Sequence, residues 1–224
     1  QELFVCISHF SLPKPEGKKN IAVIFYPQFD WSKEIKRYDK VVTISKYSAD
    51  AIKEKWGIDS VIIPPPVDIS KFRIGAKRKQ IINVGRFFWE PGGNNKNQHI
   101  LIKAFSQMPK GWKLILVGAV QNNAYYESLK KMAKGLNIEF KHDIGFKELV
   151  SLYAESEFYW SATGYDAKEG SSQEHFGMVA VESLASGCRT LVYDGGGMSE
   201  ITGVEKWKTI NELVNKTLLE VTGK

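Results

Sequence analysis

The sequence predicts an α/β protein built around a doubly wound parallel sheet, accompanied by part of a second α/β domain. Short apolar runs alternate along the chain with segments whose apolar residues recur at helical spacing. This β-α order is typical of doubly wound folds. Most of the apolar runs show no polar alternation, which indicates strands that are buried on both faces, as in a parallel sheet.

The expected elements follow one another regularly along the chain. The apolar runs predict strands at 3–7, 21–26, 41–45, 61–63, 81–85, 114–118, 138–140, 158–162 and 190–194. The helical patterns between them cover 47–56, 97–107, 123–134, 146–155, 177–186 and 209–219.

Two of these helices have recognisable ends. Asn97 suits the N-cap of the helix at 97–107, where its side chain would accept a hydrogen bond from an early amide. The helix at 177–186 is expected to end at Gly187. Its apolar residues would share one face: Met178, Val181, Leu184 and Ala185.

Three consecutive prolines at 64–66 interrupt this order. Because proline has a fixed φ and no amide to donate to a sheet, we expect a linker at 64–80. Residues 1–63 would then be the C-terminal part of one α/β domain, and residues 81–224 would form the second domain. The first residues enter an apolar run without a signal-peptide pattern or an initiator methionine, so we expect the sequence to start inside a domain.

Composition limits the classes of function. The 224 residues carry a net charge of +6, so an anionic partner and plainly solvated lysines are both open. Cys6 and Cys188 form neither a disulfide framework nor a metal-site spacing, and a reducing, cytoplasmic setting is expected. No apolar stretch approaches the ~20 residues that cross a bilayer.

Residues 82–105 form the first candidate site. A buried strand would end at Gly85 and Arg86, and a loop would lead to Lys96 at the start of a helix. The carboxyl ends of parallel strands are where α/β folds bind ligands, and a helix N-terminus beside cations attracts anions. The loop contains neither a dinucleotide fingerprint nor a P-loop. Surface cations beside a flexible loop would look the same, so the segment alone leaves both interpretations open.

The segment SSQEHFGMVAVESLASG at 171–187 holds two glutamates that are eight positions apart. Glu174 would lie in a loop ahead of a helix, whereas Glu182 would lie about a turn and a half inside that helix. With the backbone amides near 176–178, the two carboxylates suit a ligand that carries many hydroxyl groups. The alternative is a helix-start glutamate favoured by the helix dipole together with one solvated glutamate.

Two further segments carry weaker signals. Residues 112–129 repeat the order of strand, glycine, polar loop and helix, which an ordinary β-α turn explains. His142 and Asp143 have no third ligand clustered with them in the sequence, so no metal site is predicted.

Several motifs occur in an order that one family shares. They are VGR, KN, LIKAF, LILVG, LVSLY, EHFGMVAVE and GGGMSEI. With them, the sequence resembles the C-terminal, donor-binding domain of retaining glycosyltransferases with the GT-B fold, the group 1 or family 4-like enzymes that include glycogen synthases and lipid-linked mannosyltransferases. The resemblance covers about residues 40–202. It implies a Rossmann-like donor-binding domain at 81–224 and the end of an acceptor-side domain at 1–63.

The resemblance also implies roles for individual residues. Arg86 and Lys96 would hold the donor diphosphate. Glu174 and Glu182 match the family's E-x7-E pair, in which the first contacts the transferred sugar and the second binds the ribose hydroxyls. The other donor-binding positions are Gly85, Ile144 in the turn that holds the base, Phe176, Gly177 and Met178.

Two features depart from the family pattern. His9 is a candidate for the cleft histidine of many members, but IFYP at 24–27 aligns at least as well with that strand and has no histidine. The loop between Arg86 and Lys96 is longer than the usual link, so Lys96 would reach the donor differently.

The implied reaction moves a sugar from a nucleotide-diphosphate sugar, such as GDP-mannose or a UDP-sugar, to a hydroxyl of a glycan or lipid-linked acceptor with retention of configuration. Neither an essential metal nor another cofactor is expected, because fixed cations and helix-end amides can stabilise the leaving diphosphate. A mannosyltransferase is one option, as is peripheral association with the cytoplasmic face of a membrane. This stretch by itself is expected to bind the donor and to catalyse poorly.

A non-catalytic module that binds anions or nucleic acids is the competing interpretation. It predicts steeply salt-dependent binding through scattered lysines. It gives no reason for the paired glutamates, which would repel phosphate, and no nucleic-acid partner is therefore expected. A third possibility is an epimerase or a phosphorylase of the GT-B type. A phosphorylase would need a lysine that holds pyridoxal, and no lysine of the sequence has a distinct context for it.

Overall fold

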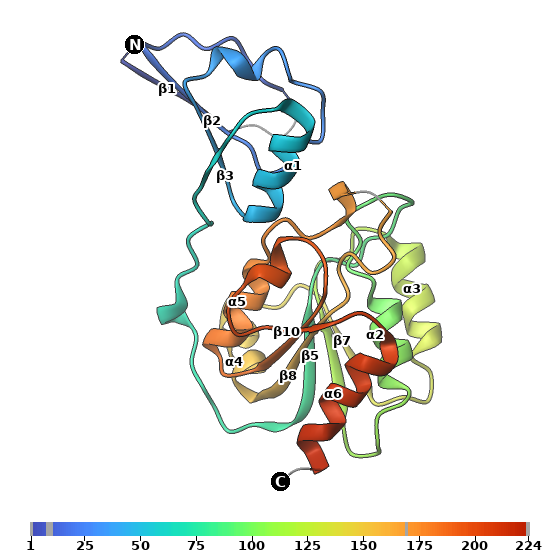
Figure 1. Cartoon of the computed structure of the whole chain (residues 1–224). Coiled ribbons are helices and arrows are strands. Elements are labelled where there is room, and N and C mark those ends of the chain that lie inside the picture. Colours follow the sequence, from blue (N-terminus) through green and yellow to red (C-terminus); the bar gives the residue numbers. More distant parts are fainter. Residues whose placement is uncertain (1, 8–10, 169, 223–224) are drawn as a thin grey trace. The chain divides into compact units, whose positions relative to one another are not determined.

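The computed structural model describes residues 2–7, 11–168 and 170–222. Contacts divide the chain into two compact units, each with its own sheet and core (Figure 1). Unit 1 consists of residues 1–66 and 174–176, and unit 2 consists of residues 67–173 and 177–224. The first division falls inside the predicted linker, whose own boundaries stay a prediction.

Unit 1 is a four-stranded parallel sheet with the order β1-β2-β3-β4. Its elements are β1 (Leu3–Ile7), β2 (Lys19–Val23), a 3-10 turn (Ile35–Arg37), β3 (Lys40–Thr43), α1 (Lys46–Trp56) and β4 (Val61–Ile62). The helix starts where the Ser45 hydroxyl accepts a hydrogen bond from the Ser48 amide at 3.1 Å, as a serine N-cap should. Ile52 and Trp56 bury its inner face in the core of the unit.

Unit 2 is a six-stranded parallel sheet with the order β10-β9-β8-β5-β6-β7. Its strands are β5 (Arg78–Val84), β6 (Lys113–Val117), β7 (Ile138–Lys141), β8 (Ser156–Ser161), β9 (Arg189–Tyr193) and β10 (Glu205–Trp207). Its helices are α2 (Gln98–Phe105), α3 (Asn123–Met132), α4 (Phe146–Glu155), α5 (Met178–Ala185) and α6 (Ile210–Thr222). Short 3-10 turns lie at Ile69–Lys71, Gly170–Ser172 and Gly197–Glu200.

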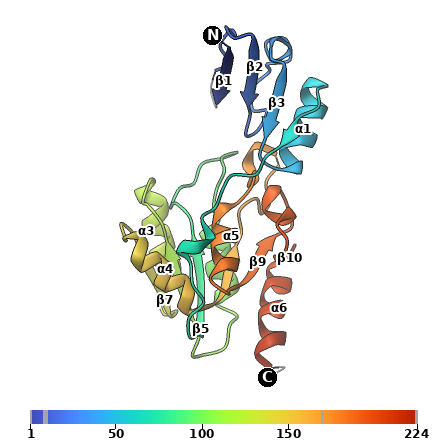
Figure 2. The ribbon, with the colours of Figure 1, turned by 90° about the vertical axis from the view of Figure 1, so that its left-hand side faces the viewer.

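Successive residues of the strands in unit 2 enter two separate cores. On β5, Ile81 packs in the core that α2, α3 and α6 cover, whereas Ile82 packs in the core that α4 covers and Val179 of α5 adjoins. Helices therefore lie on both faces of a wholly parallel sheet, as Figure 1 and Figure 2 show. The predicted doubly wound α/β fold is confirmed.

The predicted strands and helices are all found, with ends that differ by at most three residues. The sequence patterns miss β10 at the edge of the sheet. Only Trp207 in this strand is a large apolar residue, and it is completely buried. A three-residue strand with one apolar side chain shows no period that sequence analysis could detect.

The predicted capping role of Asn97 is wrong. Asn97 occupies the N-cap of α2 but has a left-handed backbone, with φ 51°, and its side chain makes no capping hydrogen bond. An N-cap side chain reaches the helix amides from an extended backbone, which Asn97 lacks. Its Nδ2 instead donates to the carbonyl oxygens of Ala162 at 3.0 Å and Tyr165 at 3.3 Å.

The predicted buried face of α5 is also wrong. Met178 is 47% exposed, and the completely buried residues of the helix are Ala180 and Ser183. These small side chains let α5 approach the sheet closely, where the Ser183 and Thr190 hydroxyls lie 2.7 Å apart. The helix is capped at Ser186 rather than at Gly187, one residue earlier than predicted.

Candidate functional site

The candidate site lies at the carboxyl edge of the six-stranded sheet in unit 2. Because all six strands are parallel, the segments that follow them emerge at one edge, where α/β folds bind ligands. Gly85 and Arg86 follow β5, and Ile144 follows β7. Gly177 and Met178 start α5 after the loop that leaves β8, so they lie at the same edge.

Two glycines allow close packing at the ends of β5 and β6. A Cβ at Gly118 would lie 2.1 Å from the Gly85 carbonyl oxygen, and a Cβ at Gly85 would lie 2.8 Å from Lys96 Cγ. Side chains do not fit at such distances in a close-packed protein. The aliphatic stem of Lys96 therefore packs directly on the backbone of Gly85.

Arg86 and Lys96 are the predicted cations of this edge. Arg86 is exposed, and its guanidinium lies 5.1 Å from the centre of the Phe88 ring. The Lys96 amine donates to Asn94 Oδ1 at 2.7 Å, and Asn94 Nδ2 donates to the Gln173 carbonyl oxygen at 2.6 Å. These contacts restrict both cationic side chains, which lowers the entropic cost of holding an anion.

The start of α5 supplies backbone amides. The φ of Gly177 is 95°, in the left-handed region that favours glycine, and a Cβ there would lie 2.6 Å from Met198 Cε. Within the described part of the chain, no side chain caps this helix. Its first amides lack partners inside the helix and can bind an anion.

Glu182 is held in place by a tyrosine of the neighbouring helix. The hydroxyl of Tyr153, a buried residue of α4, donates to Glu182 Oε2 at 3.1 Å. Burial raises the pKa of the Glu182 carboxyl above its usual value, and the hydrogen bond from Tyr153 partly opposes that rise. One carboxylate oxygen is thus positioned by the protein, and the other can accept a hydrogen bond from a ligand hydroxyl.

We predict that Glu182→Gln stabilises the ligand-free chain increasingly as the pH rises. The pKa of Glu182 is higher in the folded state than in the unfolded state, so the folded state binds more protons between these two values. The wild type therefore loses stability as the pH rises through this interval, and the neutral amide removes that loss. Urea unfolding at several values from about pH 4 to about pH 7 measures the difference.

Glu212 provides a matched control of opposite sign. Hydrogen bonds from Lys216 and from the Lys208 amide lower the pKa of the Glu212 carboxyl. Its contribution to stability is present above the unfolded pKa and is lost as the pH falls, so Glu212→Gln should lose relative stability as the pH rises. If Glu182→Gln followed the same direction as Glu212→Gln, the raised pKa of Glu182 would be refuted.

The remaining predicted site residues are placed as follows. Glu174 and Phe176 are half-buried and belong to unit 1, whereas Gly177, Met178 and Glu182 belong to unit 2. The two glutamates of the pair are therefore described in different units. Ile144 is half-buried and packs against the core on the α4 side of the sheet. His9 lies outside the described residues.

Residues 2–7, 11–168 and 170–222 contain no group of three or more His, Cys, Asp or Glu side chains that could hold a metal ion. Cys6 and Cys188 are buried free thiols, and burial raises the pKa of Cys188 to about 11. Among the helices of the described residues, none has the length and apolar character that crossing a membrane requires.

Sequence patterns do not single out two residues that shape this edge, Gln98 and Tyr153. Tyr153 is 29 positions from its partner Glu182, so no local spacing reports the contact. Gln98 is completely buried and donates to the carbonyl oxygens of Gly85 and Arg86 at 3.1 Å each. A glutamine at the start of a largely apolar helix was the one sequence signal that could have indicated a polar contact here.

Curated relatives were found for most of the chain. A GDP-Man:Man(3)GlcNAc(2)-PP-Dol alpha-1,2-mannosyltransferase of Dictyostelium discoideum is 29% identical over 172 residues, which are 67% of this chain and 32% of that protein. The Homo sapiens protein of the same name is 26% identical over 187 residues, 71% of this chain and 35% of its own length. The mannosylfructose-phosphate synthase of Agrobacterium fabrum is 25% identical over 188 residues, 71% of this chain and 38% of its own length. The chain thus spans between 32% and 38% of the length of these three relatives.

Solved structures share the fold. HepE of Anabaena, in complex with UDP, matches with a TM-score of 0.72 at 21% sequence identity, covering 91% of this chain and 63% of HepE. TarM matches with a TM-score of 0.76 at 16% identity, covering 99% of this chain and 48% of TarM. The fold is that of GT-B glycosyltransferases, as predicted.

The family follows from one further match. Residues 66–216 match the family of glycosyl transferases group 1, a range that holds the VGR and KN motifs and the E-x7-E pair. This range is more than half of the chain. The chain therefore belongs to the glycosyl transferases group 1 family.

Proposed function

We propose that this chain supplies the donor-binding part of a retaining glycosyltransferase. The whole protein would transfer a sugar from a nucleotide-diphosphate sugar to a hydroxyl of a glycan or lipid-linked acceptor. One observation carries the proposal: two restrained cations and an uncapped helix start lie at one edge of the sheet in unit 2, and the same helix carries a tyrosine-held carboxylate. Arg86 and Lys96 suit a diphosphate, the α5 amides suit phosphate or sugar oxygens, and Glu182 suits ribose hydroxyls.

The chemistry of the reaction agrees with these residue types. Breaking the bond between sugar and phosphate builds positive charge on the sugar and negative charge on the departing diphosphate. Arg86, Lys96 and the α5 amides can offset the second charge, so the proposal needs no essential metal or other cofactor. Glu174 would contact the sugar beside the developing positive charge. We do not propose a nucleophilic role for it, because the carboxylate pair of retaining glycosidases faces a single bond, whereas Glu182 is assigned to the ribose.

A mannosyl donor is the first candidate. Two kinds of curated relative carry mannose in their names, a GDP-Man-dependent mannosyltransferase and mannosylfructose-phosphate synthase. HepE was solved with UDP, which keeps UDP-sugars as the second candidate. The lipid-linked glycan named in the first relative supports an acceptor at a membrane, where the whole protein would work peripherally on the cytoplasmic face.

Thermal unfolding of the chain with GDP-mannose, UDP-glucose or ADP-glucose tests the donor assignment. A ligand at 100 times its Kd stabilises the folded state by about 2.7 kcal/mol, which corresponds to a shift of several degrees. We expect GDP-mannose to give the largest shift, and Glu182→Ala to remove most of it. Glu212→Ala should keep the full shift, because Glu212 lies on α6 and outside the site.

The same samples separate the donor proposal from the competing one. A non-catalytic module would show no shift with any of the three donors and would bind RNA or DNA with a steep dependence on salt. Retention is tested on the whole protein, by comparing the anomeric configuration of the sugar in donor and product by NMR. An inverted product would exclude the retaining mechanism while leaving the donor site in place.

A further inference from the structure

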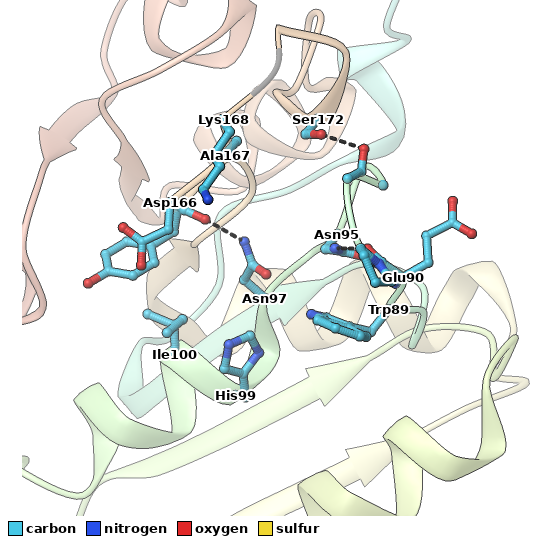
Figure 3. A pocket seen from close by; sticks show the side chains of 14 residues that line it. Trp89, Glu90, Asn95, Asn97, His99, Ile100, Asp166, Ala167, Lys168 and Ser172 are labelled. Carbon is cyan, nitrogen blue, oxygen red and sulfur yellow. Dashed lines mark hydrogen bonds between the residues drawn. The ribbon is translucent and has the colours of Figure 1, made fainter.

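Unit 2 contains a pocket of about 470 Å³ that is lined by none of the proposed donor-binding residues (Figure 3). Its volume lies within the range of roughly 300–1,000 Å³ that is usual for small-molecule sites. Most of one wall belongs to the long loop after β5, and the opposite wall belongs to residues 165–168 and 172, which follow β8. The aromatic and polar side chains around it include Trp89, Asn97, His99, Asp166, Lys168 and Ser172.

We propose that this pocket binds a neutral sugar unit of a glycan, as a saccharide site separate from the donor site. The identification of that glycan as the acceptor rests on the proposed function. The proposal that the pocket binds a saccharide does not rest on the proposed function. It follows from the walls, the aromatic side chain, the polar groups and the charges of the pocket itself.

Hydrogen bonds between the two walls give the pocket a defined shape. Ser172 Oγ donates to the Gly92 carbonyl oxygen at 2.6 Å. Asn97, which is only 7% exposed, donates from Nδ2 to the carbonyl oxygens of Ala162 and Tyr165. A ligand would therefore find the two loops already tied together, which reduces the entropic cost of binding.

Trp89 offers an aromatic surface to a sugar ring. The side chain is 43% exposed, and in Figure 3 it lies across the pocket from Asp166, Ala167 and Lys168. Its backbone is held by Asn122, whose Nδ2 donates to the Trp89 carbonyl oxygen at 3.3 Å. The face of an indole ring carries partial negative charge, and the C–H groups on one face of a sugar ring carry weak positive charge, so the two can stack.

The tautomer of the neutral His99 ring follows from a chain of hydrogen bonds. Gln98 Nε2 donates to the carbonyl oxygens of Gly85 and Arg86, which leaves Gln98 Oε1 as an acceptor. The Tyr125 hydroxyl donates to that oxygen at 3.2 Å and therefore accepts from His99 Nδ1, which lies 3.1 Å away. The neutral ring carries its proton on Nδ1, so Nε2 can accept a hydrogen bond from a sugar hydroxyl.

The charges around the pocket favour a neutral ligand. Burial, followed by the nearby Lys103 amine, lowers the pKa of His99, and the ring is neutral at about pH 7. Among the described residues, the other ionisable groups of the lining, apart from the Tyr165 phenol, are the carboxylates Glu90 and Asp166 and the amine of Lys168. A phosphate group would meet more negative than positive charge. Sugar hydroxyls both donate and accept hydrogen bonds, so they can pair with carboxylates, an amine and an imidazole together.

The pocket adjoins the donor edge through one short segment. Asn95 and Asn97 line the pocket, and Lys96 between them packs on Gly85. Gln98 joins His99, through Tyr125, to the end of β5. A sugar bound here suits a part of the acceptor glycan that is remote from the reacting hydroxyl, because the reacting part must lie at the donor sugar.

Isothermal titration of the 224-residue chain with neutral trisaccharides of mannose, glucose and galactose tests the proposal. We expect at least one trisaccharide to bind with a Kd of about 1 mM or tighter. Trp89→Ala should weaken that binding about tenfold or more, and Trp89→Phe should restore part of it because an aromatic face remains. Lys168→Ala, a second and exposed position, should weaken it several-fold.

Leu219→Ala is the matched control, since Leu219 is an exposed apolar residue on α6 and does not line the pocket. The thermal midpoint of each variant establishes that it is folded. The saccharide site is refuted if no trisaccharide binds, or if the Trp89 and Lys168 variants bind as well as the wild type. The two proposals can also fail separately. If the wild type binds a trisaccharide but not GDP, and the Trp89 and Lys168 variants lose the trisaccharide, the saccharide site is supported and the donor assignment is overturned.

Discussion

Replacing Glu174 by alanine is expected to reduce sugar transfer by the whole protein about 100- to 1,000-fold while leaving its fold intact. In the proposed function Glu174 would contact the transferred sugar, where positive charge develops as the bond to the diphosphate breaks. Loss of one preorganised group aimed at such a charge costs about this factor in turnover. Transfer of labelled mannose from GDP-mannose to a glycan acceptor measures the change.

Glu174→Gln separates two roles for this carboxylate. The amide keeps the hydrogen-bonding shape but loses the negative charge, so near-normal transfer would indicate that Glu174 positions the sugar. A loss as large as that of the alanine variant would indicate that its charge steadies the reacting centre. GDP affinity should be nearly unchanged in both variants, because Glu174 is not assigned to the nucleotide. Unchanged turnover in the alanine variant would refute the assignment of Glu174 to the sugar.

Most of the fold follows from local patterns in the sequence. A strand such as β6 is a continuous apolar run because helices cover both faces of its sheet, and the run is visible without any other part of the chain. The edge strand β10 is different. Its place depends on Trp207, which packs 5.8 Å from the Tyr165 ring and 5.4 Å from the Tyr193 ring, centre to centre. Contacts between such distant segments have no periodic signature.

The difference between local patterns and long-range contacts also explains which parts of the site were predictable. Gly85, Arg86 and Gly177 lie at the carboxyl edge because parallel strands all end there, and order along the chain determines that. The partners of two other residues were not predictable. The contact between Tyr153 and Glu182 joins residues 29 positions apart, and that from Asn97 to Ala162 joins residues 65 positions apart. Side-chain hydrogen bonds of this kind depend on tertiary packing, which overrides the local capping preference of asparagine.

The second large effect is expected from Lys96→Ala, which should weaken GDP binding about 10- to 100-fold. A hydrogen bond between charged groups contributes about 1.5–3 kcal/mol, and each 1.4 kcal/mol corresponds to a factor of ten in Kd. Guanosine, which has no phosphate, should bind the variant and the wild type equally. Lys103→Ala is the matched control, because Lys103 is an exposed lysine on α2, seven positions further along the chain.

Gly85→Ala tests the same site without removing a charge. The new Cβ would lie 2.8 Å from Lys96 Cγ, so the lysine stem must move away from the backbone of β5. If the diphosphate is held by a lysine whose position this glycine determines, Gly85→Ala should lose much of the GDP affinity that Lys96→Ala loses, and the two losses should not add. Equal losses for Lys96→Ala and Lys103→Ala would instead assign the effect to the overall positive charge of the chain. A diphosphate site formed by Lys96 and Gly85 requires non-additive losses in Lys96→Ala and Gly85→Ala and no comparable loss in Lys103→Ala. Only in such a site does the position of the charge, as well as its presence, determine the affinity for GDP.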